Sequence, residues 1–387
     1  MQYRSYKDNS TARNITRVLL MLLFLSFTVC YIHYMQCDFI ALTQHILSGG
    51  RTQYNRIIGT LSITATAFAI QVLFSRVFVL PTAIYAVSYI PSALFLAAVT
   101  DLIPDFEPFK LAIYATVLIV CISLYIHWSS ASSKRQRAAC ATSSLISNTA
   151  IIAVIMLTTG ITGNTKRILH YELKAEHYLA SNDFDKTLGI GIKSTETSKM
   201  LTDLRAYALA RKGILNEKIF EYPIPAGMRS FLPMPDDSTK MTFNPRNIYG
   251  WLGAEPHTPV MQEQFLNTVS TQPELADTHP QIMEYQLATL LLNKQIDSFA
   301  TAVKEWKGDS IKRSDLPKHF REALVLYQRL RTKPVITIKD DLTETNYNDF
   351  AKMKHAAQNS HKNANALRLQ YGDTYWWHYF FVKQPGK

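Results

Sequence analysis

The feature that most constrains the fold is a series of long apolar runs, nearly free of charged residues, within the first 163 residues. Crossing a bilayer as a helix takes about 20 apolar residues, and a charged side chain at its centre costs several kcal/mol. Five runs meet these conditions, at 16–33, 57–74, 77–99, 111–128 and 142–161. The sequence therefore predicts a bundle of about five transmembrane helices. The third is expected to be kinked, because it contains Pro81 and Pro91.

The remainder of the chain has a different character. From residue 164 onward charged residues are frequent, and no apolar run is long enough to span a membrane. The mean hydropathy of −0.04 is thus an average over two unlike parts. All four cysteines, Cys30, Cys37, Cys121 and Cys140, lie in the first part, so no disulfide can hold the second part together. We predict a transmembrane domain at 1–163 and a soluble domain at 164–387.

Basic residues in the short loops predict the orientation, because the side richer in Lys and Arg faces the cytoplasm. One side has Arg4, Lys7, Arg13, Arg17, Arg76, Lys134, Arg135 and Arg137. The other side has Arg51 and Arg56 with Asp101, Asp105, Glu107 and Lys110, whereas Lys166 and Arg167 oppose the assignment. The bias predicts a multi-pass protein of the inner (cytoplasmic) membrane with its N-terminus inside. After an odd number of spans, the C-terminal domain would lie outside, in the periplasm of a Gram-negative cell.

The soluble part has the pattern of paired helices. "KAEHYLASNDFDKTLGIGIKS" predicts two amphipathic helices joined at Asn182–Asp183, and "LRAYALARKGILNEKIFEYP" predicts a second pair about 31 residues downstream. A third, weaker pair is "YQLATLLLNKQIDSFATAVKEW", and "LPKHFREALVLYQRL" adds one more helix beginning at Pro317. Small and aromatic residues recur at tetratricopeptide offsets. We therefore expect an all-α protein whose soluble domain is a tetratricopeptide-like helical repeat.

Two further segments of the soluble part stand out. A Pro-rich insertion at about 222–260 cannot form long helices, and it either packs over the repeats or forms a binding loop. The aromatic stretch "YGDTYWWHYFFVK" at 371–383 is too short to span a membrane, and no basic groove adjoins it that would suit nucleic acid. We interpret it as a cap that covers the last helices. The alternative is an aromatic surface that docks at the membrane interface.

Five sequence pieces resemble one protein family, and they come from both parts of the chain. They are "LTQHILSGGRTQYNR", "YIPSALFLAAVTD", "LRAYALARKGILNEKIFEY", "LPKHFREALVLYQRLR" and "YGDTYWW". The chain resembles uncharacterised multi-span inner-membrane proteins from Bacteroidetes that carry a tetratricopeptide-like C-terminal domain. The resemblance implies a Gram-negative inner membrane with a periplasmic domain, and it implies no particular activity.

The polar segment "QHILSGGRTQYNR" at 44–56 is the candidate site, together with two acidic residues predicted on the same side of the membrane. Its members are His45, Arg51, Gln53, Asn55, Arg56, Asp101 and Asp105. Of these, Arg51, Gln53, Asn55 and Arg56 could converge on an anion such as a lipid headgroup. Alternatively, they cap the second span and anchor it at the headgroups. The segments "LGIGIKS" and "HYELKAEH" are interpreted as a helix end and a solvated helix, so no catalytic residue, cofactor or metal is predicted.

Two functions are compatible with this sequence. The leading hypothesis is a non-enzymatic, membrane-anchored interaction or scaffold protein that binds a protein partner in the cell envelope through its helical repeats. The alternative is an integral-membrane enzyme or carrier that acts on an envelope lipid or glycan through the 44–56 segment. Contacts with membrane lipid are expected in both cases, and nucleic acid in neither. The sequence leaves the oligomeric state open.

Overall fold

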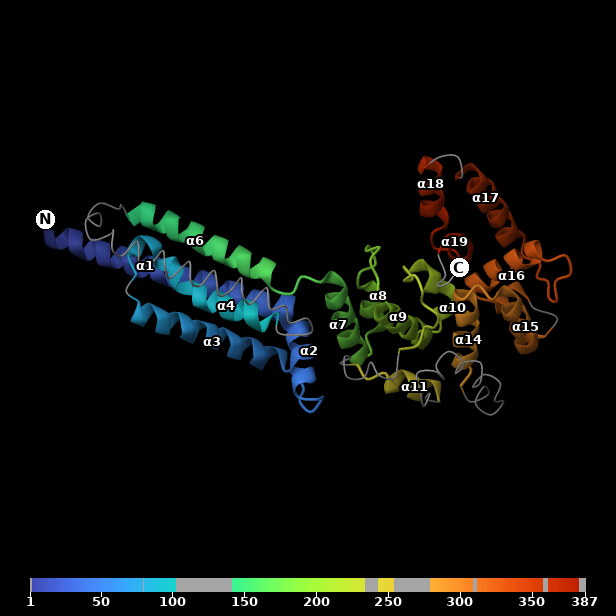
Figure 1. The fold of residues 1–387 in the computed structure, drawn as a ribbon, viewed down its shortest axis with the longest axis horizontal. Coiled ribbons are helices and arrows are strands. Elements are labelled where there is room, and N and C mark those ends of the chain that lie inside the picture. The colour runs from blue at the N-terminus through green and yellow to red at the C-terminus, as the bar shows by residue number, and fades with distance from the viewer. Residues whose placement is uncertain are drawn as a thin grey trace. The chain divides into compact units, whose positions relative to one another are not determined.

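The structure is a computed structural model of the chain, and it describes residues 2–78, 80–101, 141–233, 243–253, 279–308, 312–357 and 361–382. The chain folds as two compact units, Met1–Lys166 and Arg167–Lys387. Every regular element in the described ranges is a helix, as Figure 1 shows. The prediction of an all-helical protein is therefore confirmed for this part of the chain.

The first unit opens with a long helical run that changes form partway. α1 (Gln2–Cys30) continues through a π-helical segment, Tyr31–Gln36, into α2 (Cys37–Leu47). Figure 1 shows α2 turning away from the axis of α1. The first span was predicted to end at residue 33, but the helix continues to Leu47 because the π-helical segment redirects it without breaking it.

The π-helical segment directs two polar side chains into the unit. Tyr31 and Gln36 are both buried. The Tyr31 hydroxyl lies 3.0 Å from Oγ1 of Thr100, and Nε2 of Gln36 donates to the carbonyl of Asn164 at 3.1 Å. A Cβ at Gly163 would lie 1.9 Å from the Tyr31 hydroxyl oxygen, so only glycine fits there. These contacts attach the first helical run to the chain that leaves the last helix of the unit.

Three more helices complete the described part of the first unit. They are α3 (Arg56–Val77), α4 (Ile90–Val99) and α6 (Ala141–Thr162). Between α3 and α4 lies a 3₁₀-helical segment, Thr82–Tyr89, which contains a residue with non-helical dihedral angles, Ile84 (φ −130°, ψ 25°). The predicted third span at 77–99 is therefore not one kinked helix. It is a broken element, because two prolines interrupt the helical hydrogen bonds.

The surface of this unit is apolar, as a membrane-embedded surface would be. Three helices in the described ranges are long and apolar enough to cross a membrane, Arg13–Leu47, Arg56–Val77 and Leu145–Thr162. Many of their large apolar side chains point outward, including those of Leu22, Leu23, Ile57, Ile58, Leu61, Leu73, Ile146, Val154, Leu157 and Ile161. The predicted fourth span at 111–128 lies outside the described residues. The structure therefore supports membrane association through three candidate spans.

The second unit contains three helix pairs in its described part. They are α7 (Arg167–Ala180) with α8 (Phe184–Gly189), α9 (Lys199–Arg211) with α10 (Leu215–Lys218), and α14 (Gln281–Leu292) with α15 (Ile296–Lys307). All three pairs were predicted from the sequence, and all three are confirmed.

The three pairs turn in the same way. Each first helix ends on one residue in the left-handed conformation, Asn182 (φ 56°), Gly213 (φ 70°) or Lys294 (φ 57°). In each turn, the N–H of this residue donates to the carbonyl three residues back. The next N–H donates to the carbonyl five residues behind itself. This pair of backbone hydrogen bonds is the Schellman motif, which satisfies the last carbonyls of the helix. The three pairs therefore share one type of turn.

The described part of the Pro-rich insertion belongs to the core of the second unit. It contains one short helix, α11 (Arg246–Leu252). Phe231, Leu232 and Ile248 are fully buried in the main hydrophobic core. The Tyr249 hydroxyl donates to the carbonyl of Pro233 at 2.5 Å. The sequence left open whether the insertion packs over the repeats or forms a binding loop. The described residues pack over the repeats.

Four helices close the second unit. They are α16 (Lys318–Leu330), α17 (Asp341–Ala357), α18 (His361–Tyr371) and α19 (Tyr375–Phe381). α19 contains most of the aromatic stretch and packs against α16 and α18. Tyr375 and Trp376 are buried, and the Trp376 ring contacts Tyr347 and Phe350 of α17. The prediction that this stretch is buried against the last helices is confirmed.

Candidate functional site

The predicted polar segment at 44–56 is partly helix and partly loop. His45 belongs to the last turn of α2, and the loop follows from Ser48. Gly49 (φ 58°) and Gly50 (φ 77°) adopt left-handed conformations that end the helix. A Cβ at Gly50 would lie 3.3 Å from Cε1 of His45, so the turn packs closely on the imidazole ring. Of the candidate segment 44–56, residues 44–47 therefore lie in α2 and Arg56 begins α3, and only the residues between them form a loop.

Two of the predicted site residues, Asn55 and Arg56, make contacts within the first unit. Oδ1 of Asn55 accepts the backbone N–H groups of Ile57 and Ile58 at 3.0 and 3.1 Å, which caps α3. Nη2 of Arg56 lies 2.5 Å from Oδ1 of Asp38, a residue of α2. The pair attaches the start of α3 to α2. These contacts match the alternative in which the polar residues cap and anchor the second span.

The other predicted site residues have different surroundings. Arg51 and Gln53 are exposed in the loop. Asp101 is half-buried after α4, where its backbone N–H donates to the carbonyl of Ala98. Asp105 lies outside the described residues. Exposed Arg51 and Gln53 could contact a lipid headgroup or a solute, and the structure brings neither together with a catalytic partner.

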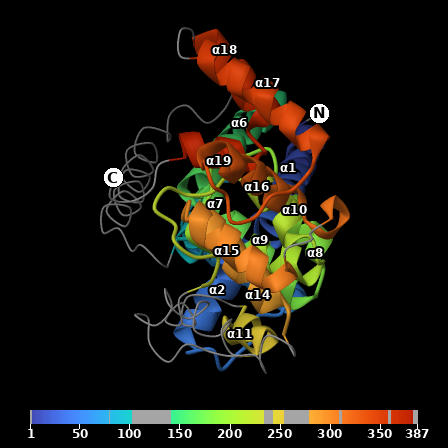
Figure 2. The ribbon, with the colours of Figure 1, turned by 90° about the vertical axis from the view of Figure 1, so that its right-hand side faces the viewer.

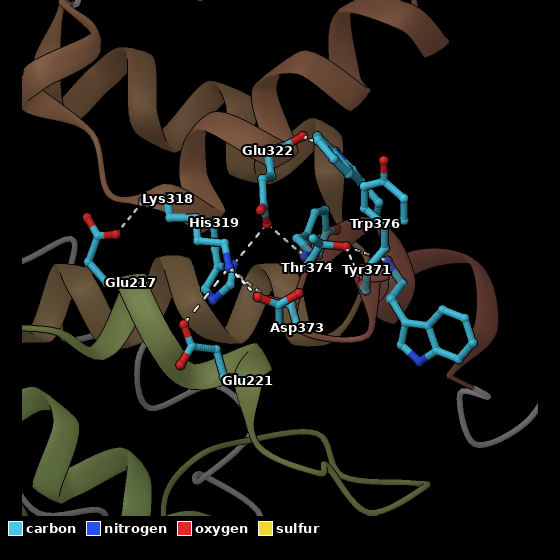
Figure 3. A network of polar contacts seen from close by, with 11 residues as sticks. Glu217, Glu221, Lys318, His319, Glu322, Tyr371, Asp373, Thr374 and Trp376 are labelled. Carbon is cyan, nitrogen blue, oxygen red and sulfur yellow. Dashed lines mark hydrogen bonds and ion pairs between the residues drawn. The ribbon is translucent and has the colours of Figure 1, made fainter. Parts of the chain in front are cut away.

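A second polar cluster, which the sequence did not suggest, lies where α19 meets α16 (Figure 3). Its centre is Glu322 of α16. Oε2 of Glu322 accepts the backbone N–H of Tyr375 at 2.8 Å and lies 2.9 Å from Nδ1 of His319. The Glu322 carbonyl accepts the indole N–H of Trp376 at 2.8 Å. One glutamate therefore fixes the first turn of α19 at two points, Tyr375 and Trp376, and contacts His319 of its own helix. We call these residues, with His378, the Glu322 cluster.

Two histidines of the Glu322 cluster flank the Phe220 ring. The ring centroids of His319 and His378 lie 5.0 and 4.8 Å from that of Phe220. Nε2 of His378 donates to the carbonyl of Leu292 at 3.0 Å. Burial lowers the pKa of His378 from 6.5 to about 4, although the bond to Leu292 opposes the shift. His378 is therefore neutral at physiological pH.

A network of charges lies beside the Glu322 cluster at the start of α16. Nζ of Lys318 lies 2.9 Å from Oδ2 of Asp373 and 3.9 Å from Oε1 of Glu221. Its backbone N–H donates to Oε2 of Glu217 at 3.0 Å. Burial lowers the pKa of Lys318, but the hydrogen bond to Asp373 and the surrounding carboxylates outweigh it, so the pKa is raised. The network joins α10, α16 and the turn before α19.

The Glu322 cluster is a structural contact between helices. His319 has no exposed surface, and Glu322 and His378 are 5% and 4% exposed, so a substrate cannot reach the His–Glu pair. Among the described residues, no group of three or more His, Cys, Asp and Glu side chains could hold a metal ion. A signal was present in the sequence, because His319 and Glu322 lie one helical turn apart on the apolar face of α16. Polar residues on such a face predict a buried pair.

Comparison with known proteins gives one match. No curated protein matches the chain, and no solved structure does. Residues 261–382 match the model of a family of unknown function (DUF6057). The matched stretch includes α14 to α19 and therefore the whole Glu322 cluster. The part of the chain that resembles a known family is thus the C-terminal half of the second unit.

Proposed function

We propose that the protein is a membrane-anchored scaffold that presents a helical-repeat domain to a protein partner in the cell envelope. The observation that carries the proposal is the shared turn of the three helix pairs, at Asn182, Gly213 and Lys294. Stacked helix pairs with a common geometry leave a concave surface that can hold a peptide or a helix. Tetratricopeptide-like packing accounts for this repetition.

The membrane part supplies the anchor in this proposal. Three candidate spans support attachment to a membrane, and the five apolar runs support a five-span bundle. The loop charges favour an inside N-terminus and a periplasmic repeat domain. The resemblance to Bacteroidetes inner-membrane proteins favours the same arrangement. The alternative function, an enzyme or carrier that works through residues 44–56, would have to rely on Arg51 and Gln53, because Asn55 and Arg56 are engaged elsewhere.

The experiment is site-specific photocrosslinking in cells. A photoreactive residue is placed at His177 of α7 or at Thr301 of α15, both exposed, and in a matched control at Thr52 in the loop of the first unit. The scaffold proposal expects one specific envelope protein to be captured from His177 or Thr301 and not from Thr52. It also expects that envelope protein to co-purify with the full-length protein and not with a variant that lacks residues 167–387. Capture of the same protein by the deletion variant, or from Thr52 alone, would contradict the proposal.

A further inference from the structure

Arg211, the last residue of α9, is an exposed cation flanked by three aromatic rings. Its guanidinium carbon lies 5.0 Å from the ring centroid of Phe184, 5.6 Å from that of Tyr207 and 6.0 Å from that of Trp251. A cation at such distances is attracted by the faces of aromatic rings. The rings belong to α8, α9 and α11, so the first two helix pairs and the insertion meet at one side chain.

The three rings are held by the core of the second unit. Tyr207 is buried, and Phe184 and Trp251 are partly buried against the main hydrophobic core. The rings of Tyr207 and Trp251 also contact each other edge to face, with their centroids 5.6 Å apart. Nη1 of Arg211 donates to the Tyr207 hydroxyl at 2.7 Å. The guanidinium is therefore fixed in place before a ligand arrives, which reduces the entropy that binding would cost.

The other edge of the guanidinium has no partner within the described part of the chain. There, Nε and Nη2 of Arg211 make no hydrogen bond, and no carboxylate lies within ion-pair distance. The two acids at the start of α8 are engaged by lysines. Asp185 pairs with Lys212, and Asp183 pairs with Lys186 at 2.6 Å. Because Nε and Nη2 lie on one edge of the guanidinium, together they can hold both oxygens of a carboxylate.

A carboxylate suits this position better than a phosphate does. Arg211 lies at the C-terminal end of α9, where the helix carbonyls disfavour negative charge. A carboxylate carries one negative charge, which the guanidinium neutralises alone, whereas a phosphate group carries about two at neutral pH. The planar carboxylate also matches the planar fork of the guanidinium. The partly buried rings of Phe184 and Trp251 offer apolar surface to the chain that carries the carboxylate.

We propose that Arg211 is the binding site for a carboxylate of the protein partner, on an Asp or Glu side chain or at a C-terminus. The inference rests on the proposed scaffold function and names the chemistry by which the partner is recognised. Nε and Nη2 donate to the two carboxylate oxygens, and Tyr207 positions the guanidinium through Nη1. Phe184 and Trp251 lower the local dielectric, which strengthens the ion pair.

The test is the retention of short random-sequence peptides by the full-length protein, immobilised in detergent, with mass spectrometry of the retained peptides. Three forms of one peptide pool are compared. The first has all carboxylates free, the second has amidated C-termini, and the third has every carboxylate converted to a methyl ester. The wild-type protein should retain peptides of the first pool and not of the third. The second pool shows whether the carboxylate comes from a side chain or from a C-terminus.

Variants assign the retention to Arg211. Arg211→Gln should weaken it about tenfold, the effect of losing one charge-assisted pair. Tyr207→Phe should weaken it by a smaller factor, because the ring stays and only the hydroxyl that positions the guanidinium is lost. Arg368→Gln is the matched control. It removes the same charge from an exposed arginine of α18, which also has no carboxylate within ion-pair distance among the described residues.

The outcomes separate this inference from the scaffold proposal. Equal retention by Arg211→Gln and Arg368→Gln, with both variants folded, overturns the role of Arg211 and leaves the scaffold proposal standing. Equal retention of the free and esterified pools overturns the carboxylate as the ligand. Retention of no peptide by the wild-type protein also overturns the inference, and the photocrosslinking experiment then decides the scaffold proposal by itself.

A second variant keeps the test decisive if Arg211→Gln fails to fold. Arg211→Lys retains a cation beside the rings, but a lysine cannot hold both carboxylate oxygens in the same fork. Its retention of the first pool should fall below that of the wild-type protein. Undiminished retention by this variant would overturn the two-point contact.

Discussion

At the scale of single residues, Glu322 links α16 to α19 in the second unit. Its carboxylate and carbonyl together hold Tyr375, Trp376 and His319, which come from two helices that are far apart in sequence. A buried carboxylate is stabilising only when hydrogen bonds satisfy it. Here the backbone N–H of Tyr375 donates to the carboxylate and Nδ1 of His319 lies 2.9 Å from it, so this side chain joins α19 to α16.

Replacing Glu322 by glutamine should destabilise the second unit by about 1 kcal/mol, because the amide oxygen can still accept the buried Tyr375 N–H but without the assistance of a charge. Pulse proteolysis in urea on the full-length protein measures the change. Glu305→Gln is the control, since Glu305 is exposed on α15. Equal midpoints for the two variants would show that the Glu322 contacts contribute nothing to stability.

His378 should make the stability of the second unit depend on pH. Its pKa is about 4 in the folded protein, against 6.5 for an unperturbed histidine. The unfolded chain therefore takes up a proton first as the pH falls. Stability is fully present above pH 6.5 and decreases between pH 6.5 and about 4, by up to about 1.4 kcal/mol per pH unit.

The measurement is the urea midpoint as a function of pH for the wild type and for His378→Gln, whose amide can still donate to Leu292. The variant should lose the part of the pH dependence that His378 contributes. Parallel curves for the two proteins would contradict the assignment.

At the scale of elements, the turns between paired helices depend on backbone conformation. Gly213 has a positive φ of 70°, and a Cβ there would meet no atom within 4 Å. The cost of a side chain at this position is therefore purely conformational. Gly189 also has room for a Cβ, but it lies within the helical conformation of α8. The two glycines thus separate the effect of conformation from the effect of space.

Gly213→Ala should destabilise the second unit by about 1 kcal/mol, because a left-handed conformation is unfavourable for alanine. Gly189→Ala should be neutral or slightly stabilising, since alanine favours a helix and restricts the unfolded chain. Denaturant midpoints of both variants provide the comparison. The same change in both would show that the shared turn does not require a left-handed residue.

In the first unit, Asn148 holds the backbone of the broken segment Thr82–Tyr89. Asn148→Ala removes both bonds to the broken segment, at Thr82 and Ala86, and should lower stability in detergent by about 1 kcal/mol. Thr149→Ala is the control, because the Thr149 side chain is exposed and bonds only to its own helix. Thermal unfolding in detergent measures both. A similar effect of the two changes would mean that the broken segment is held by apolar packing alone.

At the scale of the whole molecule, the sequence divides into an apolar part and a charged part, and the structure divides into two units. The first exposes apolar side chains on its candidate spans. The second buries its apolar side chains in one large core built from the helix pairs, the insertion and α19. The first unit thus has a surface suited to contact with lipid, and the second has a surface suited to contact with water. The scaffold proposal rests on this difference.

The predicted topology can be tested because the second unit contains no native cysteine. In a variant whose four native cysteines are replaced by serine, Thr301→Cys should react with a membrane-impermeant maleimide in cells with a permeabilised outer membrane. Ser5→Cys should react only after the inner membrane is opened. The reverse pattern would place the repeat domain in the cytoplasm and contradict the periplasmic assignment.

The sequence by itself determined the features that depend on local composition. The apolar runs at 16–33, 57–74 and 142–161 predicted three spans that overlap the candidate spans Arg13–Leu47, Arg56–Val77 and Leu145–Thr162, because burial in lipid needs a continuous apolar surface. Asn182–Asp183 marked the turn of the first helix pair, because Asn and Asp favour turns. The aromatic residues of 371–383 indicated a buried end, because so much apolar area favours burial.

Only the tertiary structure decided the features that depend on contacts between distant residues. Asn55 and Arg56 looked like ligand donors until their partners in α2 and α3 were known. Glu322 looked like an ordinary helical glutamate, and its role becomes visible only where α19 packs on α16. The broken segment Thr82–Tyr89 is hydrogen-bonded to Asn148, which is far away in sequence. The physical reason is common to all three cases: a polar side chain has no fixed role until the fold supplies its partner.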